Sequence, residues 1–267
     1  MKLAFISDIH ANLPALEAVM DDIWRRNPDF VYCLGDLVNF AGWDNEVVDY
    51  IRETGIACVQ GNHDEGIGHN SYSFEYTANN IQERLYGEQS ISWVNKCITD
   101  NNRMYLANLP LLFHVEYKTD FDRLRITMMH GNSLSANDVL PITEQTDETS
   151  LSDLFNKTDS DILIIGHTHI PYHKIIEVET AGRKTYRHIV NVGSVGKSRL
   201  KDNRAVYCMM NIDTSKNWME SPSSFDIDFI RLPYNTEAVV TKIKELGLPD
   251  TYNNFLSESS YLYEYHK

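Results

Sequence analysis

The fold is decided at residues 3–24, which read LAFISDIHANLPALEAVMDDIW. The stretch opens with a short apolar run at residues 3–7, which predicts a buried strand. From Leu13 onward, apolar side chains recur at the three- and four-residue spacing of a helix that buries one face. Asn12 can cap this helix and Pro14 suits its first turn, so the stretch predicts a strand, a turn and a helix in immediate succession.

The same alternation continues for two more strands. Residues 30–34 and 56–60 are short apolar runs, and residues 46–52 between them have helical spacing. Alternating strands and helices predict a parallel sheet with crossover helices. The alternation stops at residues 66–109, where polar, helix-favouring sequence predicts a helical insertion. It directly follows the Gly61–Asp64 stretch, which is part of the candidate active site described below. This insertion either narrows the approach to the site or only covers the edge of the sheet.

Strands dominate the second half of the chain and predict a second, mixed sheet. Apolar or alternating runs lie at residues 111–117, 124–129, 162–165, 186–192, 205–212 and 225–232. An amphipathic helix is expected at residues 236–246, within a helical tail that covers residues 233–267. No linker divides the chain, so we expect one domain over residues 1–267 with an α/β fold of two sheets flanked by helices.

Charge and composition exclude several classes of function. The chain has 267 residues, and 24 Lys and Arg against 38 Asp and Glu give a formal net charge of -14. An acidic surface disfavours nucleic acid and anionic lipid, so we expect neither a nucleic-acid nor a membrane partner. No apolar run approaches the ~20 residues of a membrane span and no signal peptide is evident, which favours the cytoplasm. The four cysteines form no C-x-x-C pair, so no thiolate metal site is indicated.

Five short motifs each follow a predicted strand. They are Asp8-Ile9-His10, Gly35-Asp36, Gly61-Asn62-His63-Asp64, His130-Gly131 and Gly166-His167-Thr168-His169. Loops at the carboxyl ends of strands in a wound sheet meet at one crevice even when they are distant in sequence. Alternation in an extended segment also sends Asp8 and His10 to one side, and likewise His167 and His169. We therefore expect imidazoles, carboxylates and an amide to converge.

The chemistry of these side chains predicts a metal site. Seven nitrogen and oxygen donors without a thiolate suit Mn, Fe, Co, Ni or Zn rather than calcium. The seven are Asp8, His10, Asp36, Asn62, His130, His167 and His169. They exceed the four ligands of one tetrahedral zinc and are enough for two ions that share a carboxylate. A single buried histidine or Gly-Asp turn is more often structural, but chance does not explain all five motifs in this order after strands.

In their order, the motifs resemble the signature of the calcineurin-like metallophosphoesterase superfamily, which reads D-x-H, G-D, G-N-H-[DE], H and G-H-x-H. The likeness is closest to its small prokaryotic branch of phosphodiesterases and asymmetric dinucleoside tetraphosphate hydrolases, in residues 7–19, 35–40 and 191–196. It implies a four-layer αββα sandwich of two mixed sheets. Ala11 and Val192 stand where the family usually has Gly and Pro. Asn39-Phe40-Ala41 replaces the Asp-Arg-Gly of serine/threonine protein phosphatases and symmetric dinucleoside tetraphosphatases, which disfavours both identities.

The resemblance also implies a role for each motif residue. Asp8, His10 and His169 would hold a first divalent ion, Asn62, His130 and His167 a second, and Asp36 both. His63 stays unligated, where it protonates the leaving oxygen or stabilises the transition state. Asp64 either orients His63 or caps its loop.

Four further residues are candidate substrate contacts. Gly193 and Ser194 either offer exposed amides to an anion or form a plain turn. Asn12 and His69 are the other two, with a helix cap and a solvated loop as their alternatives.

Together these expectations describe a phosphohydrolase with two divalent metal ions. A hydroxide that bridges the ions would cleave phosphoester or phosphoanhydride bonds in a small nucleotide, a diester or a dinucleoside polyphosphate. The alternatives are a phosphomonoesterase or protein phosphatase and, from another class, a non-catalytic interaction scaffold, because the same fold serves in the retromer coat. Tyr72, Tyr76, Trp93 and Tyr105 either stack a nucleobase at the crevice or pack helices on the sheet.

Overall fold

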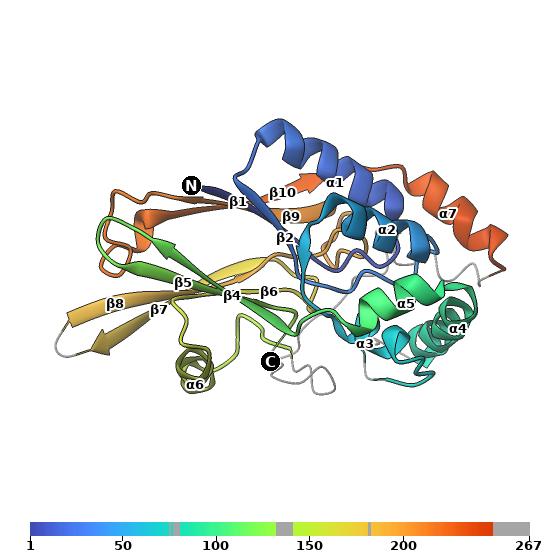
Figure 1. The fold of residues 1–267 in the computed structure, drawn as a ribbon, viewed down its shortest axis with the longest axis horizontal. Helices are drawn as coiled ribbons and strands as arrows, with labels where there is room; N and C mark the ends of the chain where they lie inside the picture. The colour runs from blue at the N-terminus through green and yellow to red at the C-terminus, as the bar shows by residue number, and fades with distance from the viewer. Residues whose placement is uncertain (75, 77–80, 132–140, 181–182, 248–267) are drawn as a thin grey trace.

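Two mixed sheets of five strands each form the centre of the protein (Figure 1). The computed structural model describes residues 1–74, 76, 81–131, 141–180 and 183–247. The strand order is β10-β9-β1-β2-β3 in the first sheet and β4-β5-β6-β8-β7 in the second. The strands are β1 (Lys2–Ile6), β2 (Phe30–Cys33), β3 (Ala57–Cys58), β4 (Leu112–Lys118), β5 (Arg123–Met129), β6 (Ile162–Ile165), β7 (Tyr172–Thr180), β8 (Arg183–Asn191), β9 (Ala205–Ile212) and β10 (Phe225–Leu232).

Each sheet contains three neighbouring parallel strands, which lie at one side of the first sheet and at the centre of the second. β1, β2 and β3 are parallel in the first sheet, and β5, β6 and β8 are parallel in the second. Antiparallel strands complete both sheets, with β9 and β10 beside β1, and β4 and β7 at the two edges of the second sheet. The three parallel strands of each sheet therefore present their carboxyl ends, and the loops that follow them, at one end of that sheet.

Helices cover the outer faces of both sheets. α1 (Leu13–Arg26) and α2 (Asp44–Thr54) lie on the first sheet, and α6 (Glu148–Thr158) lies under the second (Figure 1). The remaining helices gather at the right of the view, beyond the ends of β1 and β2. They are α3 (Asn62–Gly68), α4 (Ile81–Cys97), α5 (Asp100–Ala107) and α7 (Thr236–Glu245), while a short 3-10 helix, Pro222–Ser224, precedes β10. Within the described ranges, no helix is long and apolar enough to cross a membrane.

Three apolar cores separate the four layers. In β1, Leu3 and Phe5 point into the core between the two sheets, whereas Ala4 and Ile6 pack against the helices on the outer face. This alternation follows the two-residue period of a strand that is buried on both faces. A third core joins the second sheet to α6. The αββα sandwich expected from the sequence is therefore confirmed.

Local signals account for the start of α1, and three later helices lie within the predicted ranges. The side chain of Asn12 accepts a hydrogen bond from the Ala15 backbone N–H at 3.2 Å and caps α1, with Pro14 in the first turn. Helices α4 and α5 lie within residues 66–109, and α7 lies within residues 233–267. Residues 248–267 of the expected tail are outside the described residues.

Besides α3 and the 3-10 helix, two elements were not expected from the sequence. The first, α6, buries Leu151, Leu154 and Phe155 at helical spacing within a short and otherwise polar stretch. The second, β7, is an edge strand whose nine residues pair with β8, and its charged outer side chains hide the strand pattern. β3 is also shorter than the expected 56–60, because the chain turns at Gln60, whose backbone N–H donates to the Pro110 carbonyl at 2.7 Å.

Candidate metal centre

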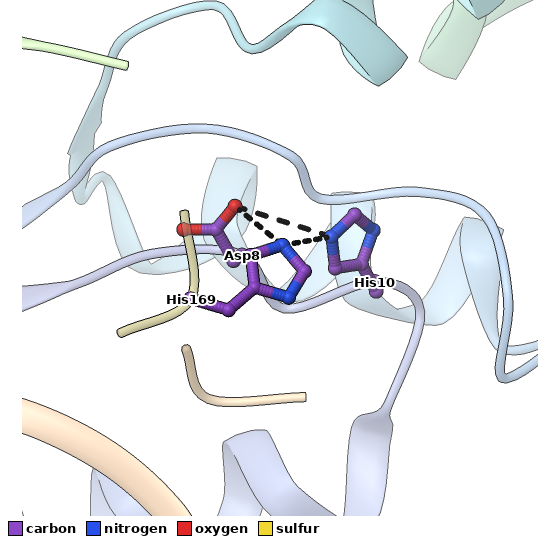
Figure 2. A group of neighbouring side chains, drawn as sticks. All are labelled: Asp8, His10 and His169. Atoms are coloured by element: carbon purple, nitrogen blue, oxygen red, sulfur yellow. Dashed lines mark hydrogen bonds and ion pairs between the residues drawn. The ribbon is translucent and has the colours of Figure 1, made fainter. Parts of the chain in front are cut away.

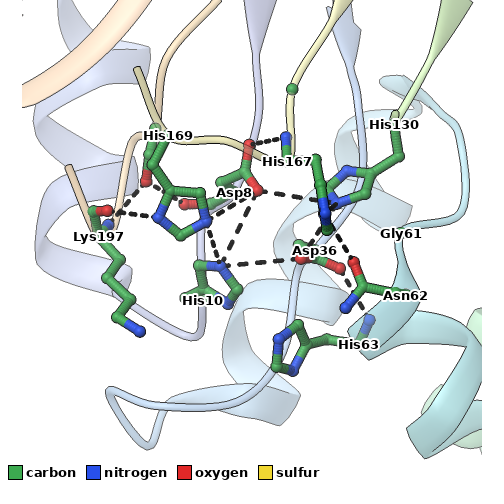
Figure 3. A network of polar contacts seen from close by, with 12 residues as sticks. Asp8, His10, Asp36, Gly61, Asn62, His63, His130, His167, His169 and Lys197 are labelled. Carbon is green, nitrogen blue, oxygen red and sulfur yellow. Dashed lines mark hydrogen bonds and ion pairs between the residues drawn. The ribbon is translucent and has the colours of Figure 1, made fainter. Parts of the chain in front are cut away.

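The predicted ligands meet at the carboxyl ends of the parallel strands of the two sheets (Figure 3). Asp8 and His10 follow β1, Asp36 follows β2, and Asn62 follows β3 at the start of α3. The second sheet contributes the other three, with His130 after β5 and His167 and His169 after β6. All seven side chains are 9% exposed or less, so the groups face one another rather than solvent.

The loops bring these residues together by a route other than the one expected. Asp8, His10, Asp36, His167 and His169 all have φ between 49° and 69°, which is left-handed rather than extended backbone. The expectation that strand alternation orients them is therefore wrong. Tight loops do so instead, and each left-handed residue costs about 1 kcal/mol or more. Hydrogen bonds between the loops offset this cost, since Asp8 and His10 donate their backbone N–H groups to the carbonyls of Gly35 and Asp36 at 2.9 Å.

A first group of three possible ligands consists of Asp8, His10 and His169 (Figure 2). Nε2 of His169 lies 3.1 Å from both Oδ1 of Asp8 and Nε2 of His10. The Nδ1 atoms of both histidines point away from this group. Nδ1 of His169 lies 2.6 Å from the Lys197 carbonyl oxygen, and Nδ1 of His10 lies 3.3 Å from the Val38 carbonyl oxygen. Because a carbonyl only accepts, each Nδ1 carries a proton and each Nε2 presents its lone pair to the centre of the group.

A second group consists of Asp36, His130 and His167, with Asn62 beside it. Nε2 of His130 lies 3.2 Å from Oδ2 of Asp36, and its Nδ1 donates to the Leu34 carbonyl at 2.6 Å. Nδ1 of His167 is 3.1 Å from Oδ1 of Asn62 and 3.3 Å from Nε2 of His130. The Asp36 carboxylate also lies 3.8 Å from Nε2 of His10, so it stands between the two groups.

The residues fit divalent cations on their own chemistry. Oδ2 of Asp8 accepts the His167 backbone N–H at 3.0 Å, whereas Oδ1 is buried and accepts no hydrogen bond from the described residues. Such an atom facing the lone pair of His169 requires a cation for compensation. Nitrogen and oxygen donors in this mixture suit borderline divalent ions.

The protonation states agree with that requirement. Burial alone raises the pKa of Asp8 and Asp36, but the nearby histidines overcome it and keep both carboxyl groups ionised. Burial lowers the pKa of His10 well below its usual range and that of His167 to about 3. The pKa of His130 is raised to about 10, because the two aspartates outweigh its burial. The two carboxylates are thus anionic and the imidazoles of His10 and His167 are neutral, which are the protonation states of metal ligands.

His63 lies beside the cluster on α3. Its backbone N–H donates to Oδ1 of Asp36 at 2.9 Å, and its Nδ1 lies 3.0 Å from Nδ2 of Asn39. Phe74 and Tyr76 enclose the ring, with centroid distances of 5.2 and 5.6 Å. Burial, together with the charge of a nearby lysine, lowers the pKa of His63 to about 4 despite Asp36, so the imidazole is neutral.

The orientation of the Asn39 side chain defines the tautomer of His63. Oδ1 of Asn39 accepts hydrogen bonds from the Phe40 backbone N–H at 3.0 Å and from the Ser90 hydroxyl. The amide NH₂ group therefore faces His63 and donates to Nδ1, which leaves the proton on Nε2. The sequence analysis did not select Asn39 as a site residue. The replacement of Asp-Arg-Gly by Asn39-Phe40-Ala41 was the one sequence feature that pointed to this position.

Asp64 holds the loop of Asp36 rather than the ring of His63. Its carboxylate accepts the backbone N–H groups of Asp36 and Leu37 at 2.8 Å and that of Gly61 at 3.0 Å. Burial and the charge of Asp36 raise its pKa to about 7. Among the hydrogen bonds of the described residues, none joins the carboxylate to the His63 imidazole, so the geometry favours the loop-capping alternative.

Asn12 and His69 lie outside the ligand cluster. Asn12 is buried, and its Nδ2 donates to the Gly196 carbonyl at 2.9 Å in addition to capping α1. His69 lies at the far end of α3, where its exposed ring bonds to the Glu65 carbonyl at 3.0 Å. These positions favour the helix cap and the solvated loop.

Gly193 and Ser194 are buried behind the cluster. The Gly193 N–H donates to Oδ1 of Asn191 at 3.1 Å, and the Ser194 hydroxyl donates to the Asp8 carbonyl at 2.8 Å. These buried positions favour the plain turn over exposed amides, since both residues support the Asp8 loop from within the protein.

Lys197 and Arg199 are site residues that the sequence analysis missed. Both line the hollow above the cluster together with Phe40 and Tyr76. Nζ of Lys197 lies 3.7 Å from the centroid of the Phe40 ring, a cation–π contact. Neither cation belongs to a motif, and only the loop after residue 196 brings them to the site. Tyr76 is the one member of the aromatic set that lines this hollow, while Tyr72 is 54% exposed.

The fold and the cluster of histidines and carboxylates define a metal-dependent phosphoesterase. Residues 1–215 match the model of the calcineurin-like phosphoesterase superfamily domain, and the chain belongs to this family. It is thus a hydrolase of a family that binds divalent metals and acts on phosphorylated substrates.

The chain is also similar to individual proteins. The chain is 31% identical over 255 residues to the uncharacterized protein MJ0912 of Methanocaldococcus jannaschii, which covers 93% of this chain and 94% of that protein. It is similar in structure to a metallophosphoesterase from Sphaerobacter thermophilus, with a TM-score of 0.67, 25% identity and coverage of 96% and 98%. The fold is also shared with hypothetical protein PH1004 from Pyrococcus horikoshii OT3, with a TM-score of 0.68, 16% identity and coverage of 96% and 97%.

Proposed function

We propose that this chain is a two-metal phosphohydrolase that cleaves small phosphodiesters or phosphoanhydrides, with a nucleotide diester or dinucleoside polyphosphate as the leading substrate class. One observation carries the proposal. Two groups of buried ligands, Asp8 with two histidines and Asp36 with two others, lie side by side, and Asp36 reaches both. Such an arrangement suits a pair of ions that share a carboxylate.

The ligands divide between the two ions as the geometry groups them. Asp8, His10 and His169 would hold one ion, Asn62, His130 and His167 the other, and Asp36 both. Mn, Fe, Co, Ni and Zn are the candidate metals. When bound, the ions supply a nucleophile from water near neutral pH and positive charge for the phosphoryl oxygens.

His63 acts on the substrate rather than on a metal. His10, Asp36 and His63 are close enough to form a third ligand group, so a role as ligand is the alternative. However, the Asn39 amide donates to Nδ1, and a neutral ring then keeps its proton on Nε2, where it cannot coordinate. Nε2–H can instead donate to the leaving oxygen or to the charge that develops on the phosphoryl group.

The walls of the hollow favour small anions. Lys197 and Arg199 place two cations at the cluster of a chain whose net charge is -14, which gives phosphate a local binding site. Phe74 and Tyr76, from residues 66–109, pack on His63, and Ser90 of α4 bonds to Asn39. We infer that this segment caps the site and favours substrates smaller than a folded phosphoprotein.

Metal analysis and kinetics of two variants test the proposal. Purified protein is reconstituted with Mn²⁺ and assayed on monoesters, diesters, cyclic nucleotides, dinucleoside polyphosphates and phosphopeptides. Asp36→Ala should lose both bound metal and activity. His63→Ala should keep two ions per chain and lose about 10²- to 10⁴-fold in kcat, with a smaller loss for esters of very acidic leaving groups.

Three outcomes would contradict parts of this proposal. Absence of metal after reconstitution would reject the metal site. Loss of metal from His63→Ala would make His63 a ligand. Faster turnover of a phosphopeptide than of every nucleotide would favour a protein phosphatase and remove the argument for the cap.

A further inference from the structure

A second hollow adjoins the metal cluster on the side of His167. This cavity has a volume of about 230 Å³. Its walls come from the loop at Thr143 and Gln145, from the segment after β6 at Ile170 and Tyr172, and from Arg199. His167 and Arg199 line both this cavity and the hollow above the cluster, so one ligand can extend from one into the other.

The lining of the cavity matches a compact ring system with polar edges. Ile170 and Tyr172 supply apolar surface, and the Tyr172 hydroxyl is directed to the Ile142 carbonyl at 3.0 Å, which helps to hold its ring in place. Gln145 supplies amide donors and acceptors, and the planar guanidinium of Arg199 can stack on a ring or bond to a phosphate. An alkyl chain would leave the Gln145 amide without a partner when it excluded water.

The size of the cavity limits the group to one nucleoside. Pockets that enclose a whole drug-sized ligand measure about 300–1,000 Å³, which exceeds the 230 Å³ found here. The cavity therefore suits one ring system with its sugar.

The position of His63 indicates which part of the substrate enters the cavity. His63 lines the hollow above the cluster with Phe40 and Tyr76, but it is not among the described residues that line the second cavity. A leaving group that receives a proton from His63 therefore departs on the side of these aromatic residues. In an in-line displacement the other substituent of the phosphate stays behind.

We propose that this cavity, bordered by Gln145, Ile170, Tyr172 and Arg199, binds the nucleoside that remains esterified to the reacting phosphate. The proposal rests on the phosphohydrolase function proposed above and names its substrate class, diesters of a nucleoside monophosphate. The bond between phosphorus and the leaving oxygen breaks, water supplies the new oxygen, and a nucleoside monophosphate is the product. Specificity then resides in the cavity, whereas the leaving group can vary.

Two esters with the same leaving group isolate the contribution of the cavity. Thymidine 5′-(p-nitrophenyl phosphate) and methyl p-nitrophenyl phosphate both release p-nitrophenolate, so their ratio of kcat/KM reports on the retained group. For the Mn²⁺-reconstituted wild-type protein, we expect a preference for the thymidine ester of about 10- to 200-fold, the range for pocket discrimination. Thymidine 5′-monophosphate should correspondingly inhibit more strongly than methyl phosphate.

Filling the cavity should remove this preference. Gln145 is exposed on its loop, so Gln145→Trp should occupy the cavity without disturbing a core. It should lower the preference to within about threefold of unity, and a thermal unfolding curve like that of the wild type would show that the variant is folded. Glu177→Trp is the matched control, because Glu177 is an exposed residue of β7, five residues or about 17 Å along the strand from Tyr172.

The outcomes separate this inference from the proposed function. Equal kcat/KM for the two esters in the wild-type protein, or a preference that survives Gln145→Trp, would overturn the nucleoside site while leaving the phosphohydrolase intact. Faster hydrolysis of hexyl p-nitrophenyl phosphate than of the thymidine ester would overturn it in favour of an apolar group. Failure to hydrolyse any of these esters with any of the candidate metals would instead overturn the proposed function.

Discussion

Replacement of Gly61 by alanine should displace Asp36 and empty the metal centre. Gly61 has φ −90°, so alanine is compatible with its backbone, and the effect comes from contact alone. A Cβ atom on Gly61 would lie 2.5 Å from the backbone nitrogen and 2.8 Å from Cγ of Asp36, where ordinary van der Waals contact begins at 3.4 Å. Asp36 must therefore move by about 0.9 Å at its backbone, the difference between 2.5 and 3.4 Å.

A shift of this size is large for a residue that stands between two ligand groups. Misplacement of a reacting group by about 1 Å costs about 10²-fold in rate. The same movement strains the hydrogen bonds that Asp36 makes with His63 and Asp64, at 2.9 and 2.8 Å. We expect Gly61→Ala to lower kcat by at least about 10²-fold and to reduce the metal content. Overpacking should cost only about 1–3 kcal/mol of stability.

Metal analysis, kcat for bis(p-nitrophenyl) phosphate and thermal unfolding measure these effects. Gly55→Ala is the matched control, because a Cβ there meets nothing within 4 Å, although φ is +68°. That variant should lose about 1–2 kcal/mol of stability from backbone strain and keep full activity and metal. If Gly61→Ala holds its metal and stays within threefold of wild-type activity, the argument from the contact between Gly61 and Asp36 is refuted.

Three further predictions concern other parts of the molecule. Asn39→Ala should lower kcat up to about tenfold, because one orienting hydrogen bond of about 1 kcal/mol is lost from His63, with unchanged metal content by elemental analysis. Burial lowers the pKa of His188 from 6.5 to about 3, so only the unfolded state takes up its proton as the pH falls from 6.5; His188 alone should lower the free energy of unfolding by about 2 kcal/mol between pH 7 and pH 5. His188→Phe, compared with the wild type by urea unfolding, should show a smaller drop, and an identical drop would contradict the assignment. Removal of metal with a chelator should lower the unfolding temperature, because bound ions stabilise the folded state, whereas an unchanged temperature would argue against bound metal.

The sequence by itself predicted the candidate metal ligands and the order of most strands and helices. The predicted ligands, from Asp8 to His169, each follow a strand, and strand order with parallel pairing places such loops at one edge of a sheet. Apolar periodicity also predicted β1, α1 and most later elements, because strong local patterns reflect burial directly. α6 and β7 were missed since one is largely polar and the other lies at a sheet edge.

Only the tertiary structure decided how the ligands are oriented and which other side chains surround them. Left-handed loops, rather than strand alternation, direct Asp8 and His10 inward, and their stability depends on hydrogen bonds to the loop after β2. The contact of Ser90 with Asn39 and the approach of Lys197 to Phe40 join segments far apart in the chain. Local sequence periodicity does not predict such contacts, because it indicates which face of a helix or strand is buried and not which distant side chain covers that face.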